Sequence, residues 1–423
     1  MIIPVYFTKM ISIIILSIVL ILIAVRQIGK IKLQIWQIMS IGALAALLTG
    51  QINLSAAFKA IDFDVIIFLF GMFVIGQAIE ESGYLSHFSY QLYNRAVSLD
   101  LLLLIILFTM GIASAFLMND TVAIIGTPVI LLIAKKNNIR PKILLLALAF
   151  SVTIGSVMSP IGNPQNLIIA INGGLSNSFS EFLKALFIPT IVNLFIAFAV
   201  LRLYYKDDFR KKLLNHPKEP IKDKVLASLS KVSLLVMLIL VVVKIIFSVL
   251  SLSVDFRLTY IAVGAALPII LFSKKRVSII KNIDWSTLIF FVSMFILMQS
   301  VWNSGIFQYE INNHNIQLNS TDMILTVSVT LSQLISNVPL VALYLPLLLK
   351  LGAGAKEMMA LATGSTIAGN LFILGAASNI IIIQNAEKRT GDTLTFLDFA
   401  RIGIPLTILN LLVYYFYLQY FFK

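Results

Sequence analysis

The chain has 423 residues and a net charge of +13, and 59% of its residues are hydrophobic whereas only 12% are charged. A soluble globular protein has about 25% charged residues, so this composition indicates an integral membrane protein that crosses the bilayer several times. The absence of cysteine excludes disulfides, thiolate nucleophiles and thiolate metal sites. His87, His216 and His314 fall in loops or near segment ends, which argues against a histidine proton relay or metal site.

Ten apolar stretches are interpreted as membrane spans, because a helix needs about 20 apolar residues to cross a bilayer. In chain order they are 10–25, 34–50, 64–81, 142–172, 183–204, 229–250, 256–273, 284–302, 356–386 and 396–420. Proline, glycine and asparagine interrupt 142–172, and glycine and asparagine interrupt 356–386, so we expect both of these helices to be broken inside the membrane.

Two further pairs of apolar runs, 100–117 with 121–134 and 322–336 with 338–350, return the chain to the side that it left. The last three of these runs have only 13 to 15 residues each, fewer than the roughly 20 that a full span needs. We therefore expect two re-entrant hairpins whose polar tips stop inside the membrane. Four thin spans would give the same charge pattern and are the alternative.

Lysine and arginine divide unevenly between the two faces of the membrane. If the loops alternate between the faces, one face carries 23 of these basic residues and the other carries 7. Cytoplasmic loops are the more basic ones, so we expect both termini outside and the loop 205–231 in the cytoplasm, in a protein of the plasma membrane. This distribution explains the net charge without a nucleic-acid partner. The run 10–25 is interpreted as a retained span, because the stronger charge follows it, unlike in a signal peptide.

The sequence contains an internal repeat. Residues 61–83 match 283–305 at a constant offset of 222, with nine of 23 positions identical. Polar residues and glycines match along both halves: Asp62 with Asp284, Gln77 with Gln299, Ser82 with Ser304, Asn119 with Asn337, Gly162 with Gly375, and Asn166 with Asn379. We therefore expect two copies of one unit, 1–204 and 229–423, joined by a cytoplasmic linker at 205–228.

Each copy would contain five crossings and one hairpin, and an odd number of crossings inserts the second copy upside down relative to the first. The expected fold is thus an all-α polytopic membrane protein. It is an inverted repeat of five transmembrane helices plus one re-entrant hairpin each, with broken helices at the midplane. Repeats of this kind are typical of secondary transporters, whose substrates bind near the midplane where the halves meet.

The two interruptions read SPIGNPQN (159–166) and GAASN (375–379). Each frees backbone N–H and C=O groups that must be satisfied at membrane depth. Helix N-termini attract anions, whereas unwound carbonyls coordinate cations, so we expect one midplane site with a cation pocket in each half. Simple kinks in packed helices are the alternative interpretation.

At these residues the chain resembles the ion transporter superfamily, which contains arsenite efflux pumps, sodium/proton antiporters of the same fold and divalent-anion/sodium symporters. NDTVAIIGTP (119–128) is similar to the arsenite pump branch. SPIGNPQN, SNVP (336–339) and GAASN are similar to the broken helices and the second hairpin tip of such proteins. The resemblance implies ten crossings, two re-entrant hairpins, a scaffold domain that forms a homodimer, and a mobile transport domain that holds both hairpins.

By position, the resemblance implies cation-coupling contacts at Asn119, Asp120, Thr121, Ser159, Gly162, Asn163, Ser336, Asn337, Gly375 and Ala376. We expect the substrate to meet polar side chains of the same tips and breaks, namely Asn119, Thr121, Asn163, Gln165, Asn166, Ser336, Asn337, Ser378 and Asn379. Sodium at the hairpin tips is the expected metal. The symporters carry Ser-Asn-Thr at both tips, and this chain does not, so a single coupling ion is an alternative to two.

Asp120 is the only carboxylate that the sequence places well inside the hydrocarbon. A carboxylate at that depth holds a cation or a proton, and both suit a coupling site. A helix cap for a helix starting at Thr121 is the alternative. For Lys244, inside its span, we expect the long side chain to carry the ammonium group to the outer interface rather than to a substrate.

The expected function is secondary active transport of a small anion or oxyacid, such as an inorganic anion, an arsenite-like species or a dicarboxylate. Coupling to sodium or protons would drive it by alternating access. A sodium/proton antiporter of the same fold with no anion substrate is the alternative. No cofactor and no enzymatic activity are expected, since no cluster of paired acids, histidines or cysteine is present. No nucleotide-binding motif occurs, so ATP-driven pumping would require a partner ATPase.

Overall fold

The computed structural model describes residues 3–25, 27–28, 31–32, 34–84, 96, 98–207, 221–249, 256–305, 318–390 and 394–422. The described chain is helical apart from one short antiparallel hairpin of β1 (Gln27–Ile28) and β2 (Ile31–Lys32). The three histidines and most of the predicted linker 205–228 lie outside the described residues.

The first half contains α1 (Ile3–Val25), α2 (Ile35–Leu48), α3 (Leu54–Ala60), α4 (Phe63–Ser82), α6 (Leu99–Leu117), α7 (Asn119–Lys136), α8 (Pro141–Ser156), α9 (Pro164–Asn172) and α10 (Ser178–Tyr204). The second half contains α11 (Lys224–Val249), α12 (Leu258–Phe272), α13 (Arg276–Asn282), α14 (Trp285–Asn303), α16 (Thr321–Ile335), α17 (Asn337–Lys350), α18 (Ala355–Ile367), the 3-10 turns η2 (Ala368–Asn370) and η3 (Ile373–Gly375), α19 (Ala377–Thr390) and α20 (Phe396–Tyr420). Each described helix of the first half has a counterpart whose number is ten higher.

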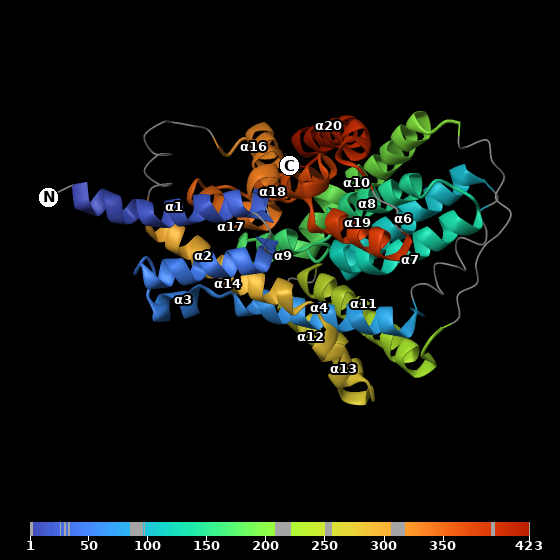
Figure 1. The fold of residues 1–423 in the computed structure, drawn as a ribbon, viewed down its shortest axis with the longest axis horizontal. Helices are drawn as coiled ribbons and strands as arrows, with labels where there is room; N and C mark the ends of the chain where they lie inside the picture. Colours follow the sequence, from blue (N-terminus) through green and yellow to red (C-terminus); the bar gives the residue numbers. More distant parts are fainter. Residues whose placement is uncertain are drawn as a thin grey trace.

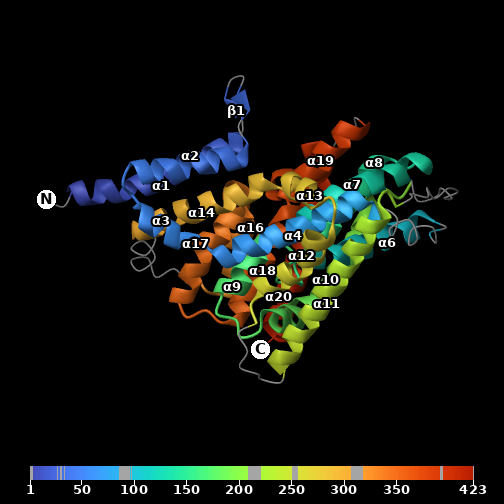
Figure 2. The same cartoon turned by 90° about the horizontal axis from the view of Figure 1, so that it is seen from below.

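The packing repeats together with the order of the helices. Helix α4 packs on α12 as α14 packs on α2, α6 packs on α8 as α16 packs on α18, and α7 packs on α19 as α17 packs on α9. In Figure 1 the first hairpin, α6 with α7, lies towards the right end of the molecule and α17 lies towards the left. Figure 2 shows the same separation from below.

Helices α10 and α20 show how the two halves meet. The Tyr204 hydroxyl, at the end of α10, donates to the carbonyl of Arg401 near the start of α20 at 2.8 Å. Midway along both helices, Asn410 Nδ2 donates to Asn193 Oδ1 at 2.9 Å and Asn193 Nδ2 donates to the Asn410 carbonyl at 3.4 Å. These two equivalent helices therefore run antiparallel around a reciprocal pair of buried asparagines.

Helix length corrects one detail of the sequence prediction. Among the described residues, six helices are long and apolar enough to cross a membrane: α4, α6, α10, α11, α14 and α20. The run 100–117, predicted as one arm of a hairpin, is the 19-residue α6, and its partner α7 has 18 residues rather than the 14 predicted. The difference arises because α7 begins at the polar Asn119 and ends at Lys136, which an apolar-run criterion leaves out.

Candidate functional site

Single residues join the two arms of each hairpin. Met118 lies between α6 and α7, and Ser336 lies between α16 and α17. Their φ angles are +67° and +70°, with ψ at 142° and 157°. Residues other than glycine rarely adopt this conformation, which costs about 1–3 kcal/mol and persists only where the surrounding structure enforces it. The same strained turn at equivalent positions indicates a functional constraint on both tips.

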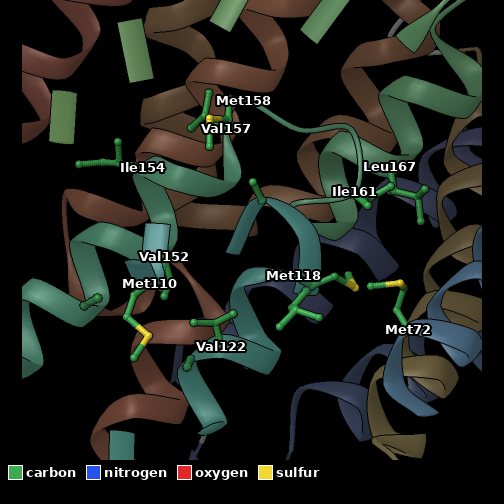
Figure 3. Close-up of a cluster of buried hydrophobic side chains, with 14 of the residues drawn as sticks. Met72, Met110, Met118, Val122, Val152, Ile154, Val157, Met158, Ile161 and Leu167 are labelled. Carbon is green, nitrogen blue, oxygen red and sulfur yellow. The ribbon is translucent and has the colours of Figure 1, made fainter. Parts of the chain in front are cut away.

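The side chain of Met118 anchors the first tip. It is buried at 1% exposure and points towards Met72 of α4, as Figure 3 shows. Val122, one turn further along α7, lies in the same apolar cluster near Met110 of α6. The corresponding residue of the second tip, Ser336, is polar and only half-buried. The first tip is therefore held by apolar packing that the second tip does not share.

The first break is determined locally. Helix α8 ends at Ser156, and α9 begins at Pro164, which has no N–H to leave unpaired in a first helical turn. Asn163 caps α9 because its Oδ1 accepts from the N–H of Asn166 at 2.9 Å. A Cβ at Gly162 would lie 2.3 Å from the Ser156 carbonyl oxygen, so only glycine fits there.

The side chain of Asn166 donates hydrogen bonds to the backbone carbonyls at the C-terminal end of α8. Its Nδ2 donates to the carbonyls of Ser156, Val157 and Ser159 at 3.1, 3.3 and 3.0 Å. The side chain is fully buried. The amide thus pairs carbonyl groups that the end of a helix leaves free.

Thr366 of α18 links the second half to the first break. Its Oγ1 accepts from Asn163 Nδ2 at 3.2 Å and from Gln165 Nε2 at 3.3 Å, and lies 3.3 Å from Asn166 Oδ1. Thr366 is not among the site residues predicted from the sequence. The repeat could have identified it, because Thr153 of α8 precedes it by 213 positions, the same offset that relates Asn166 to Asn379.

The second break is longer than predicted and less completely hydrogen-bonded. It begins at 368, seven residues before the predicted 375–379, and passes through η2 and η3 before α19 starts at Ala377. Asn379 Nδ2 donates to the Gly369 carbonyl at 2.7 Å, which repeats the contact of Asn166 with Ser156. Several buried oxygen atoms have no hydrogen-bond partner within the described part of the chain: Gln333 Oε1, Asn337 Oδ1, Asn370 Oδ1, Ser378 Oγ and Asn379 Oδ1.

The two tips also contact their breaks differently. The N–H of Asn119 donates to the Gly162 carbonyl at 2.9 Å, which fixes the first tip on the first break. Between Asn337 and Gly375, both of which the structure describes, no equivalent hydrogen bond is present. Gln333 Nε2 instead donates to the Ala368 carbonyl at 2.8 Å and holds α16 to the second break.

A pocket of about 680 Å³ lies where both tips and both breaks meet. Its lining residues are Gln34, Ile35, Trp36, Asn119, Asp120, Pro164, Gln165, Asp284, Ser286, Thr287, Phe290, Phe291, Ser336, Asn337, Val338, Ala376, Ala377, Ile380, Ile381 and Gln384. The N-terminal residues of four helices are among them: Asn119 of α7, Pro164 of α9, Asn337 of α17 and Ala377 of α19. The positive ends of these helices therefore border one cavity.

The structure brings only part of the predicted set to this pocket. Asn119, Asp120, Gln165, Ser336, Asn337 and Ala376 line it. The remaining predicted residues do not: Thr121, Ser159, Gly162, Asn163, Asn166, Gly375, Ser378 and Asn379. Some of them hold the tips and breaks in place through contacts outside the pocket. Thr121, for example, places its methyl group against Gly76 of α4, where a Cβ would lie only 2.6 Å away.

Asp284 is a pocket residue that the sequence analysis placed only at a span end. It caps α14, with Oδ1 accepting from the Thr287 N–H at 3.0 Å and Oδ2 accepting from the Thr287 hydroxyl at 2.6 Å. The signal that could have selected it is the repeat, in which it matches Asp62. The lining residues thus include two carboxylates, Asp120 and Asp284, and no lysine, arginine or histidine.

Asp120 is the second residue of α7, not its N-cap. Within the described residues, its carboxylate accepts no hydrogen bond and forms no ion pair, so the capping interpretation has no support in the geometry. The group lies at a helix N-terminus and faces the pocket, where a cation or a proton can neutralise it. No cluster of three or more His, Asp or Glu side chains suited to a metal occurs in the described part of the chain.

Lys244 does not reach the pocket. Its ammonium group donates to the Phe256 carbonyl, next to the start of α12. The contact holds the ammonium group away from the pocket, and its extension to the outer interface stays a prediction.

The pocket and the helices around it do not follow the repeat. The pocket lies between α14 and α19, both of which contribute lining residues. The counterpart helices α4 and α9 pack directly against each other, and Asn172 Nδ2 donates to Asp62 Oδ2 at 2.8 Å across their contact. The repeat of the packing is therefore broken, because α4 contacts α9 whereas the pocket lies between the equivalent helices α14 and α19.

Comparison with known proteins agrees with this architecture. A profile of the citrate transporter family matches residues 18–358. An uncharacterized transporter of Mycobacterium bovis is 29% identical over 384 residues, which cover 85% of this chain and 87% of that protein. The P protein of Mus musculus is 26% identical over 468 residues, covering 88% of this chain and 56% of that protein.

Among solved structures, the crystal structure of the YdaH transporter of Alcanivorax borkumensis matches with a TM-score of 0.57. The match covers 97% of both chains at 14% sequence identity. At this identity the likeness concerns the fold alone.

Proposed function

The chain belongs to the citrate transporter family and is a membrane transporter, and we propose that it moves a small anion or oxyacid by alternating access, coupled to sodium or protons. The family suggests a di- or tricarboxylate such as citrate as the first candidate. The observation that carries the proposal is the convergence of four helix N-termini and the Asp120 carboxylate, which has no partner among the described residues, on one pocket.

The helix N-termini favour an anion. No basic side chain is among the described lining residues, so an anionic substrate would be held by the backbone N–H groups of α7, α9, α17 and α19 and by the amides of Asn119, Gln165 and Asn337. Helix N-termini serve this purpose in other transporters with broken helices. A cation bound beside the substrate would offset the charge of Asp120.

The second break supports a cation contact without a carboxylate. Five buried oxygen atoms without hydrogen-bond partners surround it in the described structure, and Asn337 Oδ1 belongs to a residue that lines the pocket. Buried oxygens are rarely left unpaired, and carbonyl and hydroxyl oxygens are the ligands that sodium prefers. We therefore assign the coupling cation to the region of Asp120, Ser336 and Asn337.

A sodium/proton antiporter without an anion substrate is the second candidate. It is favoured by the two carboxylates of the pocket, Asp120 and Asp284, and by the lack of a basic residue in the described part of its lining. In that case Asp120 would exchange the two cations, and the four helix N-termini would have no ligand.

Transport in proteoliposomes separates the two candidates. The panel consists of citrate, succinate, phosphate, sulfate, arsenite and sodium, each tested with an imposed sodium or proton gradient. We expect gradient-driven accumulation of one anion or oxyacid class. Sodium flux driven by a proton gradient, with no movement of any other solute, would instead establish the antiporter.

The orientation is part of the proposal. With both termini outside and 205–231 in the cytoplasm, Gln34 and Asp284 follow cytoplasmic loops, so the pocket would open inward. A reporter inserted at residue 215 should then read cytoplasmic, whereas reporters at both termini should read outside.

We also propose a plasma-membrane homodimer, as the resemblance to the superfamily implies. Blue native electrophoresis of the purified protein would test the dimer.

A further inference from the structure

The two sides of the transport pathway carry equivalent residue pairs. Asp62 matches Asp284 at the offset of 222 found for α4 and α14, and Asn172 matches Asn385 at the offset of 213 found for the two breaks. Asp62 and Asp284 precede α4 and α14, whereas Asn172 and Asn385 are the ninth residues of α9 and α19. Each pair therefore consists of the residue before α4 or α14 and a residue of a broken helix.

The Asp62–Asn172 pair is joined in this structure. Asp62 Oδ1 accepts from the N–H of Val65 at 3.1 Å and caps α4, and Asp62 Oδ2 accepts from Asn172 Nδ2 at 2.8 Å. One carboxylate thus caps its own helix and holds α9 at the same time. The contact lies where α4 and α9 pack together.

The Asp284–Asn385 pair is separated. No hydrogen bond joins these two described residues, and the pocket lies between their helices. Asp284 Oδ1 caps α14 as Asp62 caps α4, but Oδ2 accepts from the Thr287 hydroxyl at 2.6 Å. The counterpart of Thr287 is Val65, which has no hydroxyl. The second carboxylate oxygen of Asp284 is thus held locally while its side of the pathway is open.

We propose that Asp62–Asn172 and Asp284–Asn385 are two alternating gate contacts, of which only one is joined at a time. In the state seen here, the first contact closes the Asp62 side. In the opposite state, α19 approaches α14, Asn385 replaces the Thr287 hydroxyl on Asp284, and Asn172 leaves Asp62. This inference rests on the proposed alternating access, because it needs the broken helices to move relative to α4 and α14.

Paired cysteines test the proposal directly, because the natural chain contains no cysteine. Two double variants are compared, Asp62→Cys/Asn172→Cys and Asp284→Cys/Asn385→Cys, in proteoliposomes treated with a short bifunctional thiol reagent. Cross-linked peptides are quantified by mass spectrometry. The matched control is Asp284→Cys/Ile383→Cys, which moves the second thiol to another face of α19.

We expect the Asp62 pair to cross-link readily in the absence of substrate and ion gradients. The Asp284 pair should cross-link more than its Ile383 control, and addition of Asn172→Ala should increase that yield about two- to tenfold, because it removes one hydrogen bond from the competing state. A four-cysteine variant should form either cross-link in one molecule but not both.

The outcomes separate this inference from the proposed function. If the unmodified protein transports a solute but the Asp284 pair never exceeds its control, the gate assignment is overturned and the transporter assignment stands. If both pairs cross-link in a mutually exclusive way although no solute of the panel is transported, the gate assignment is supported and the proposed substrate class is wrong.

Discussion

The two broken helices occupy equivalent places in the two halves, but their polar groups are satisfied in different ways. In the first break, Asn163 and Asn166 bond to α8, to α9 and to Thr366. In the second, Asn379 makes one hydrogen bond and its Oδ1 stays without a partner among the described residues. A repeated fold therefore does not imply a repeated site. The first break is organised before any ligand binds, whereas the second leaves oxygen atoms for a ligand to satisfy.

The acid at the first tip is the largest difference between the halves, because Asp120 has Val338 as its counterpart. We expect Asp120→Asn to abolish gradient-driven accumulation, a loss of at least about 100-fold, since an amide neither releases a proton nor neutralises a cation. The measurement is solute uptake in proteoliposomes with an imposed sodium or proton gradient.

Val338→Asn is the matched control, because it places the same amide at the equivalent position of the second tip and should retain coupling. Asp284→Asn is a second arm, because it keeps a capping side chain in the same pocket while removing the other carboxylate. Uncoupling by Asp284→Asn with normal coupling in Asp120→Asn would transfer the role to Asp284.

The asparagines of the two breaks should differ in their contribution to stability. Asn166→Ala leaves three buried carbonyls without this donor, so we expect a loss of about 3–4 kcal/mol, whereas Asn379→Ala removes one hydrogen bond and should cost about 1–2 kcal/mol. Unfolding of the detergent-solubilised proteins, followed by thermal scans at one fixed rate, compares them. Equal losses would mean that the breaks are alike.

The equivalent threonines sharpen the same comparison on a smaller scale. Thr366→Val removes a hydroxyl that contacts Asn163, Gln165 and Asn166, and we expect it to cost about 2 kcal/mol. Thr153 Oγ1 has no hydrogen-bond partner within the described structure, so Thr153→Val should change stability by less than about 0.5 kcal/mol. The same thermal scans apply. A larger loss for Thr153→Val would reveal a ligand or water on that hydroxyl.

Sodium should have a small effect on stability, and Asn337 of the second tip should contribute most of it. If sodium is the coupling ion, a concentration ten times its dissociation constant should stabilise the protein by about 1.4 kcal/mol. Asn337→Ala should remove most of this effect, because it deletes an unpaired oxygen of the pocket. Asn119→Ala should retain it, because Asn119 Oδ1 already accepts from the N–H of Asp120. Stabilisation by sodium that survives Asn337→Ala would place the ion elsewhere.

The local features of this protein could be predicted from its sequence. Asn163 and Pro164 set the start of α9, because proline lacks an N–H and asparagine caps the first turn. The hydrophobic lengths predicted α4 and α20 closely, and Asp62 and Asp284, which the repeat matches, each cap the helix that follows. These properties depend on chemistry within one or two turns of a helix.

The tertiary structure decided which polar residues face the pocket and which support it. Asn166 and Gln165 are neighbours in the sequence, yet Asn166 pairs the end of α8 while Gln165 lines the cavity beside Thr366, about 200 positions away. The second break begins before its predicted residues, and the pocket opens between α14 and α19 although α4 and α9 have the equivalent sequence positions. A side chain's partners at membrane depth depend on which helices pack beside it, and that packing is set across both halves of the chain rather than by the residues next to it in sequence.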